Sequence, residues 1–200
     1  KTKSTTFHIL DYPVFYFPYG VFPVKTERQS GFLIPDISLS TRNGTVINNA
    51  YFWAISKDKD ATFYLNYIED RGFNFGTEFR YASSDDFKGQ WDYFIIKDKE
   101  YDGTRWRLRG KHENKFFKDL QLKTDIQLVS DMDYLKDFGV NVAERSENQI
   151  RSTAFVEKPL TGSLFTGGLS YYRSLLSKDN NSTYQRLPYL SFFTEYIPLL

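Results

Sequence analysis

Hydrophobic and polar residues alternate along most of the chain. From Phe73 to Tyr81 the odd positions hold Phe, Phe, Thr, Phe and Tyr, whereas the even positions hold Asn, Gly, Glu and Arg. From Leu120 to Leu128 the even positions are Leu, Leu, Thr, Ile and Leu, with polar residues between them. A period of two is typical of β-strands whose two faces meet different surroundings. The pattern predicts that strands dominate and that no helix exceeds two turns.

Similar runs predict about ten to twelve strands in all. The further runs lie near residues 13–24, 31–42, 45–56, 61–69, 90–97, 106–112, 150–157, 163–173 and 187–197. Turn-forming pairs such as Asn43-Gly44, Arg71-Gly72 and Asp102-Gly103 separate them. Short turns of this kind join neighbouring antiparallel strands into hairpins. The sequence therefore predicts an all-β fold, a meander of long antiparallel hairpins.

The strand lengths favour a membrane-spanning barrel. Runs of about 9–11 residues are long enough to cross a bilayer at the usual barrel tilt. Aromatic residues gather near strand ends, as at Tyr51-Phe52-Trp53, Tyr171-Tyr172 and Phe192-Phe193, and resemble the aromatic girdle of such barrels. We expect a segment of an antiparallel transmembrane β-barrel; a soluble β-sandwich or barrel with its apolar face inward is the alternative.

Composition further limits the kinds of protein and of site that the chain can form. Aromatic residues make up 18% and charged residues 26% of the chain, and the formal net charge is +1, which argues against general nucleic-acid binding. There is no cysteine, so no disulfide or thiolate metal site can form within these 200 residues. No apolar run approaches the roughly 18 residues of a membrane-spanning helix. Because residues 192–200 are mostly apolar up to the last position, we expect the chain to be part of a longer protein.

The sequence gives little support for a catalytic function. His8 and His112 are the histidines present, and the sequence has neither a Gly-x-Ser-x-Gly motif nor a glycine-rich phosphate loop. We therefore expect no enzyme activity, no catalytic residue and no cofactor. Asp131, Asp133 and Asp137 suggest a calcium loop, but Leu135 occupies the next ligand position, so solvated loop carboxylates are the preferred interpretation and no metal is expected.

A row of cations indicates which face of one predicted strand points away from lipid. Arg105, Arg107, Arg109 and Lys111 alternate with Trp106, Leu108 and Gly110. Because a cation near the bilayer midplane costs roughly 2–4 kcal/mol on the lipid face, the row must face the lumen. Two interpretations stay open: the row contacts the phosphates of a glycolipid, or it is polar because water fills the lumen.

Prolines are concentrated near the start of the chain. Pro13, Pro18, Pro23 and Pro35 fall within predicted strands, where each removes a backbone donor from the ladder. One interpretation is a seam that is deliberately weak, since unpaired backbone groups are costly in lipid. The other is that these prolines mark strand ends or a domain junction.

Residues 13–24 read Pro-Val-Phe-Tyr-Phe-Pro-Tyr-Gly-Val-Phe-Pro-Val, and residues 30–35 read Ser-Gly-Phe-Leu-Ile-Pro. These two segments resemble the start of the barrel in the LptD family, also called OstA or Imp, which assembles lipopolysaccharide. In the family's order follow Ser40 to Gly44, Ala50 to Ile55, Asp60 to Thr62, Tyr67 to Gly72, Glu78 to Tyr81, Asp131 to Asp137 and Tyr184 to Pro188. The first twelve residues match least.

The resemblance implies a function and a domain organisation. Residues 1–12 would end a periplasmic jelly-roll region, and residues 13–200 would form the first, incomplete part of an outer-membrane barrel. The whole barrel would pass lipopolysaccharide to the outer leaflet through a lateral opening beside the first strand, where Pro18, Pro23 and Pro35 are the candidate weakening prolines. Its implied partners are lipopolysaccharide, the plug lipoprotein LptE, the periplasmic bridge protein LptA and outer-membrane lipids. The alternatives are another outer-membrane channel or receptor barrel, or a soluble β-rich binding module.

Overall fold

A computed structural model describes residues 2–9, 12–20, 28–40, 42–117 and 119–194, with the backbone alone for residues 2–9 and 13–20. The strands are β1 (Thr2–Ile9), β2 (Tyr12–Gly20), β3 (Gly31–Phe32), β4 (Asp36–Ser40), β5 (Gly44–Ala54), β6 (Lys59–Ile68), β7 (Gly72–Ser84), β8 (Phe87–Asp98), β9 (Gly103–Phe116), β10 (Leu120–Val129), β11 (Gln149–Leu160), β12 (Ser163–Ser174) and β13 (Arg186–Thr194). Two short helices, α1 (Tyr134–Phe138) and α2 (Val142–Arg145), lie between β10 and β11.

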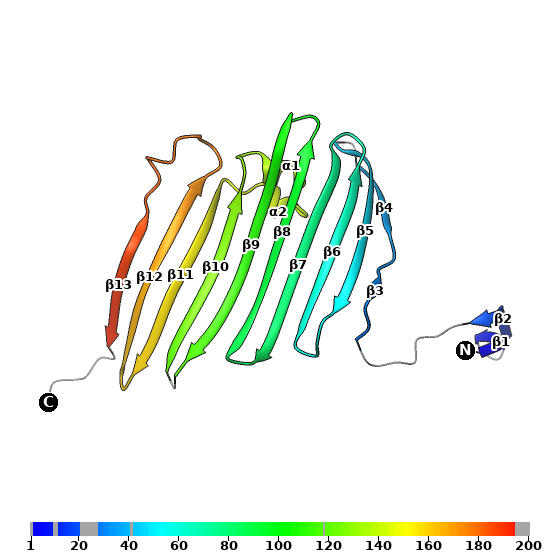
Figure 1. The fold of residues 1–200 in the computed structure, drawn as a ribbon, viewed down its shortest axis with the longest axis horizontal. Coiled ribbons are helices and arrows are strands. Elements are labelled where there is room, and N and C mark those ends of the chain that lie inside the picture. Colours follow the sequence, from blue (N-terminus) through cyan, green and yellow to red (C-terminus); the bar gives the residue numbers. More distant parts are fainter. Residues whose placement is uncertain (1, 10–11, 21–27, 41, 118, 195–200) are drawn as a thin grey trace.

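Eleven strands form one antiparallel sheet in the order of the sequence (Figure 1). Each strand from β5 to β13 pairs with its neighbours in the chain, and β3 and β4 both pair with β5 at the sheet edge. β1 and β2 pair with each other in a separate two-stranded sheet. The prediction of an all-β, antiparallel meander is confirmed, and the described helices have five and four residues.

The edge position is interrupted between β3 and β4. Phe32 pairs with Tyr51 and Asp36 pairs with Asn48, so three residues on the edge stand opposite two on β5. One extra residue in one strand is the definition of a β-bulge, which disrupts the ladder locally. Pro35 lies in this interruption and has no N–H to donate, while the N–H of Leu33 still donates to the carbonyl of Ala50 at 2.8 Å. The predicted strand 31–42 is therefore two strands that are offset by one residue.

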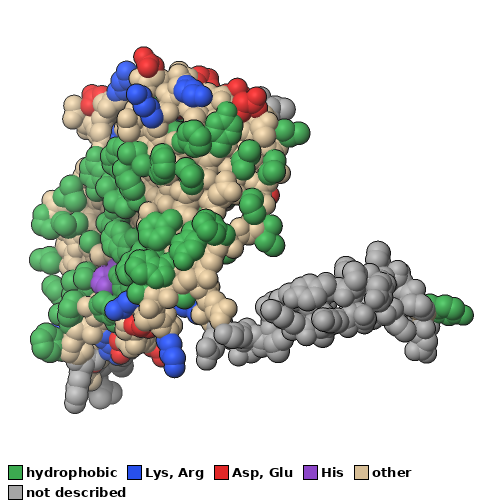
Figure 2. Space-filling model, turned by 45° about the vertical axis from the view of Figure 1, so that its right-hand side comes forward, with side chains coloured by type: hydrophobic (Ala, Val, Ile, Leu, Met, Phe, Trp, Pro, Cys, Tyr) green, Lys and Arg blue, Asp and Glu red, His purple; other side chains and the backbone are tan. Residues whose placement is uncertain are grey.

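The two faces of the sheet differ in chemistry. We call the face covered by α1 and α2 the inner face and the opposite one the outer face. Exposed apolar side chains project from the outer face, among them Phe63, Leu65, Phe73, Phe75 and Tyr93. Hydrophobic side chains spread over the middle of the sheet, with charged side chains gathered at its two ends (Figure 2). Such a band is expected where a sheet meets hydrocarbon between two aqueous boundaries.

The connections also differ between the two ends of the sheet. At one end the connections are residues 55–58, 85–86, 117–119 and 161–162. At the other, which we call the loop end, two connections are long, residues 130–148 and 175–185. The first of these, called the inward loop below, carries α1 and α2.

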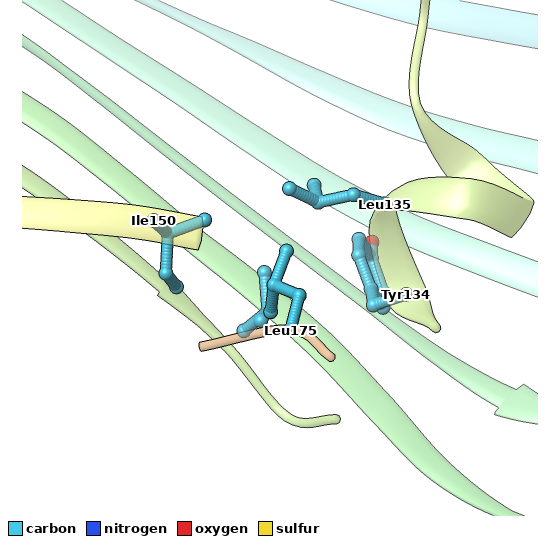
Figure 3. Packing of buried hydrophobic residues seen from close by; sticks show 5 residues of the cluster. Tyr134, Leu135, Ile150 and Leu175 are labelled. Carbon is cyan, nitrogen blue, oxygen red and sulfur yellow. The ribbon is translucent and has the colours of Figure 1, made fainter. Parts of the chain in front are cut away.

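A small hydrophobic cluster fixes the inward loop to the sheet. Tyr134 and Leu135 of α1 pack with Val129, Ile150 and Leu175, and all five are at most 2% exposed (Figure 3). These sheet residues lie at the loop end, where β10 ends, β11 begins and β12 has just ended. Because the cluster closes around the base of the loop, α1 is held against the inner face despite having little more than one turn.

Candidate functional site

Arg105, Arg107 and Arg109 lie on the inner face, where carboxylates of the protein neutralise them. Register and alternation place these arginines opposite inner-face residues of β8 such as Ile96, Phe94 and Asp92. Trp106 and Leu108, between them in sequence, point to the outer face. The geometry places the row together as its spacing suggests; its contact with a lipopolysaccharide phosphate stays a prediction.

Arg105 is the most buried member of the row, with a side chain that is 0% exposed. Its guanidinium donates to Asp98 at 2.9 Å, to Asp131 at 2.7 and 2.9 Å, and to Asp137 at 2.7 Å. The ring of Tyr101 lies 4.6 Å from its central carbon. A planar guanidinium suits this arrangement because its donors reach several carboxylates at once.

The interpretation of Asp131 and Asp137 as solvated loop carboxylates is therefore wrong. Their side chains are only 13% and 15% exposed, and both bind Arg105. β9, which carries Arg105, is far in sequence from the inward loop, so no local sequence pattern connects Arg105 with these carboxylates. Among the described residues, no group of three or more His, Cys, Asp or Glu side chains is arranged to hold a metal ion.

Arg107 and Arg109 share two further carboxylates. Asp92 on β8 accepts from Arg107 and Arg109 at 3.2 Å, and Glu144 of α2 accepts from Arg109 at 2.6 Å. Arg107 also lies 3.8 Å from Glu144. Lys111, the last member of the row, is different: its side chain is 76% exposed and stands 3.5 Å from Asp125. The row thus changes from buried to solvated away from the loop end.

The inward loop reaches back to the sheet edge. Arg42, in the turn between β4 and β5, donates to the carbonyl of Lys136 at 2.5 Å and lies 3.6 Å from Asp137. Asp137 also lies 3.5 Å from Arg71, which binds Asp98 at 3.1 Å. One carboxylate of α1 therefore connects the edge turn with β9.

Ionisable groups of the inward loop have shifted pKa values. Burial raises the pKa of Asp131, but hydrogen bonds from Arg105 and Ser130 outweigh it and the net shift is downward. Burial also raises the pKa of Glu144. The hydrogen bond from the N–H of Val140 and the charge of Arg109 lower it by more, so the net shift is again downward. Burial raises the pKa of Tyr134 to about 12. Both carboxylates are thus held in the charged form and the phenol in the neutral form.

A cleft of about 530 Å³ runs under α1 along the inner face. Its lining includes Ser38 of the edge strand, Asn48, Asn66 and Asn74 of the next strands, and Arg107 and Tyr134 further along. The asparagines were not singled out from the sequence. The available signal was the alternation around Asn74, which stands between Phe73 and Phe75. Asn48 lies beside Asn49, where the alternation is broken.

The candidate proline positions are spread over separate parts of the chain. Pro18 lies in β2, which pairs with β1 and not with the eleven-stranded sheet. Pro23 is outside the described residues, and Pro35 lies in the edge interruption. Of the three, Pro35 is next to a strand that pairs with β5. The role of all three in a lateral opening stays a prediction.

Comparison with known proteins identifies the family. The sequence profile of the family described as "LptD protein" matches residues 2–198. The chain belongs to the LptD family. It is 36% identical over 76% of its length to the LPS-assembly protein LptD of Aliivibrio fischeri. It is 32% identical over 97% of its length to that of Vibrio vulnificus strain YJ016, and 31% identical over 94% to that of Alkalilimnicola ehrlichii.

This LptD-family chain spans a fifth to a quarter of these relatives, 20% of the Aliivibrio protein and 25% of the other two. The resemblance read from the sequence is thereby confirmed at the level of the family. In the part of the chain that the structure describes, no helix is long and apolar enough to cross a membrane.

Proposed function

We propose that this chain is a wall segment of an outer-membrane barrel that delivers lipopolysaccharide to the outer leaflet through a lateral opening. The observation that carries the proposal is the interrupted edge, in a chain whose relatives are named LPS-assembly proteins. The apolar outer face supports residence in a membrane, and the long connections suggest that the loop end faces the outside, as in bacterial barrels.

The proposal includes the partners and excludes catalysis. Lipopolysaccharide would be the cargo, LptE the plug, LptA the periplasmic bridge and outer-membrane lipids the surroundings. Residues 1–12 would end the preceding periplasmic domain, and residues 13–200 would begin the barrel. An enzyme role is not proposed, because Arg105 and Arg109 on the inner face are paired with carboxylates and the relatives carry names of assembly proteins.

The interrupted edge suggests how an opening would be favoured. The β3–β4 segment has one residue too many for continuous pairing, and Pro35 withholds a donor at the same place. A hydrogen bond contributes about 0.5–1.5 kcal/mol net in water, and unsatisfied backbone groups cost more in lipid. A closing strand would therefore meet an edge that cannot pair evenly along its length.

The test is to regularise the edge in the full-length protein. Deleting Ile34 and replacing Pro35→Ala removes the extra residue and restores a donor, so we expect a continuous strand, a tighter seam and slower arrival of lipopolysaccharide at the surface. Pro35→Ala alone keeps the one-residue offset and should slow delivery less. Surface lipopolysaccharide in cells that depend on each variant is the measurement.

Folding must be monitored in parallel by heat-dependent migration of the barrel. If the regularised variant folds and delivers at the rate of the unaltered protein, the edge does not control an opening. If the unaltered full-length protein forms the barrel but delivers no lipopolysaccharide, a passive channel or receptor is the better description.

A further inference from the structure

We infer that a row of asparagines on the inner face binds the hydroxyl-rich saccharide portion of a glycolipid. This inference rests on the proposed function, since it concerns the same cargo. It arises from the sheet register, which places one polar residue of each of four neighbouring strands side by side.

Register defines the row. Asp36 pairs with Asn48, Asn48 with Asn66, and Asn66 with Asn74, so the four side chains follow one another across β4, β5, β6 and β7. The amide of Asn48 donates to Asp36 at 3.1 Å. We call these four residues, three amides and the carboxylate of Asp36, the amide row. It begins at the edge strand and ends in the cleft beneath α1.

The amide row has hydrogen-bonding capacity that the protein leaves unused. Among the described residues, the side-chain oxygens of Asn66 and Asn74 have no hydrogen-bond partner, and Asn74 is only 6% exposed. A buried polar atom without a partner costs about 1–3 kcal/mol. Three asparagines of the row line the cleft. Rotation of the Asn66 or Asn74 side chain towards the cleft would bring its unpartnered oxygen to a hydroxyl donor there.

An aromatic row lies directly beside the amide row. The next positions along the strands are Tyr64, Gly76 and Phe94, again in register. The rings of Tyr64 and Phe94 are 5.4 Å apart, and Phe94 lies over Gly76, where a Cβ would come within 2.2 Å of the ring. Gly76 is thus needed for Phe94 to lie across the sheet.

The neighbouring charges complete the environment. Glu78 follows Gly76 on the same face of β7. Its side chain lies 3.4 Å from Arg80 but is 22% exposed, and a carboxylate can accept further hydrogen bonds. Arg107 stands on the far side of Phe94. Amides and a carboxylate that accept from hydroxyls, next to flat apolar rings, fit a saccharide, whose rings have polar edges and less polar faces. Arg107 and Arg109, the arginines nearest this site, are already paired with carboxylates, so a phosphate is less well accommodated than a neutral sugar.

The binding test uses the full-length protein in detergent with the chains that purify with it. The probe is the oligosaccharide released from lipopolysaccharide by mild acid, and saturation-transfer NMR measures its binding. The combined Asn66→Leu and Asn74→Leu variant should weaken binding about tenfold, as expected for the loss of two net hydrogen bonds. Asn49→Leu is the matched control, because Asn49 pairs with Leu65 and points to the opposite face.

The outcomes separate a binding role from a structural one. Because the oxygens of Asn66 and Asn74 are unpartnered, the leucine variant should unfold no more easily than the unaltered protein. If leucine disturbs assembly, Asn66→Ser with Asn74→Ser shortens both side chains without adding apolar bulk and should weaken binding similarly. Equal binding by the unaltered and variant proteins, or no binding by either, would overturn the inference and leave the cleft to water.

A delivery assay distinguishes this failure from failure of the proposed function. Full-length protein in liposomes should deliver lipopolysaccharide with a long saccharide more slowly when Asn66 and Asn74 are replaced, and lipid anchor with minimal sugar at an unchanged rate. If the unaltered protein delivers neither, the proposed function fails. If all proteins deliver both lipids equally, only the saccharide site fails.

Discussion

At the scale of single residues, Arg105 shows why an ion pair is recognised from structure and not from sequence. The spacing of the row indicated a common face, which the register reproduces. The identity of the partners could not be predicted, because Asp131 and Asp137 come from a loop whose path depends on packing of Tyr134 and Leu135. A carboxylate in a polar loop has the same sequence signature whether water or an arginine surrounds it.

Replacing Arg105→Met should detach the inward loop. Removal of one partner leaves Asp98, Asp131 and Asp137 without their shared cation, and breaking a buried pair costs about 3–5 kcal/mol. Limited proteolysis of the full-length protein should then cut within residues 130–148 while the strands stay protected.

Lys111→Met is the matched control, since it removes a cation from the same row at a 76% exposed side chain. A solvated pair contributes only about 0–1 kcal/mol, so the loop should remain resistant. Equal sensitivity of both variants would show that total charge, and not the buried contacts of Arg105, holds the loop.

At the scale of elements, hairpins were predictable and the edge was not. Alternation together with turn pairs identifies strands such as β7 and β10, because both signals are local. The split of residues 31–42 into β3 and β4 depends on the partner strand, since only pairing with β5 reveals the extra residue. β1 was missed because residues 2–9 lack a clear apolar alternation, and their pairing with β2 supplies what the pattern does not.

The inward loop should be released by acid. Asp131 and Glu144 have ordinary pKa values of 3.8 and 4.5, and both are lowered in the folded protein. A lowered folded-state pKa contributes stability above the ordinary value, and that stability is lost as pH falls through the folded value. Hydrogen exchange of residues 130–148 should therefore accelerate below about pH 4.5, before exchange in the strands.

The opposite limit comes from Tyr134, whose pKa is raised from 10.0 to about 12. Its contribution to stability is complete below pH 10 and declines as pH rises from 10 towards 12.

The control for acid release is an Asp131→Asn, Glu144→Gln variant. Its inward loop should exchange quickly at neutral pH already, with no further acceleration in acid. Acid release that persists in this variant would assign it to other groups.

At the scale of the whole molecule, the sheet has an apolar outer face and a charged, partly covered inner face. The strand lengths and aromatic positions predicted this contrast between the faces. They did not predict which end of the sheet carries the long connections, or that the inward loop folds over the inner face. Both depend on long-range contacts, such as that between Arg42 and Lys136, for which a single sequence has no periodic signal.

An arginine on the outer face should destabilise the barrel where one on the inner face does not. Leu169→Arg would put a cation on the outer side of β12, opposite Ala154 and 47% exposed in the chain as it stands. A cost of about 2–4 kcal/mol is expected near the bilayer midplane. Thr166→Arg on the same strand faces Glu157 across the inner face and should be tolerated.

Unfolding of the full-length protein in lipid by denaturant, followed by heat-dependent migration, measures both variants. Greater loss of stability for Thr166→Arg than for Leu169→Arg would mean that the two faces have been assigned the wrong way round.

The contact between the inward loop and the edge turn has a consequence for the order of assembly. Ninety-four positions separate Arg42 from Lys136, and the intervening strands β5 to β10 must be paired before the two can meet. Contacts this distant in sequence form late, because the chain must first close the segment between them. A slip of β8 by one position would turn its side chains to the other face and displace Asp98 and Asp92 from the arginines. Docking of the loop therefore reports that this part of the wall has been built in the correct register, and an undocked loop would expose misassembled chains to proteases.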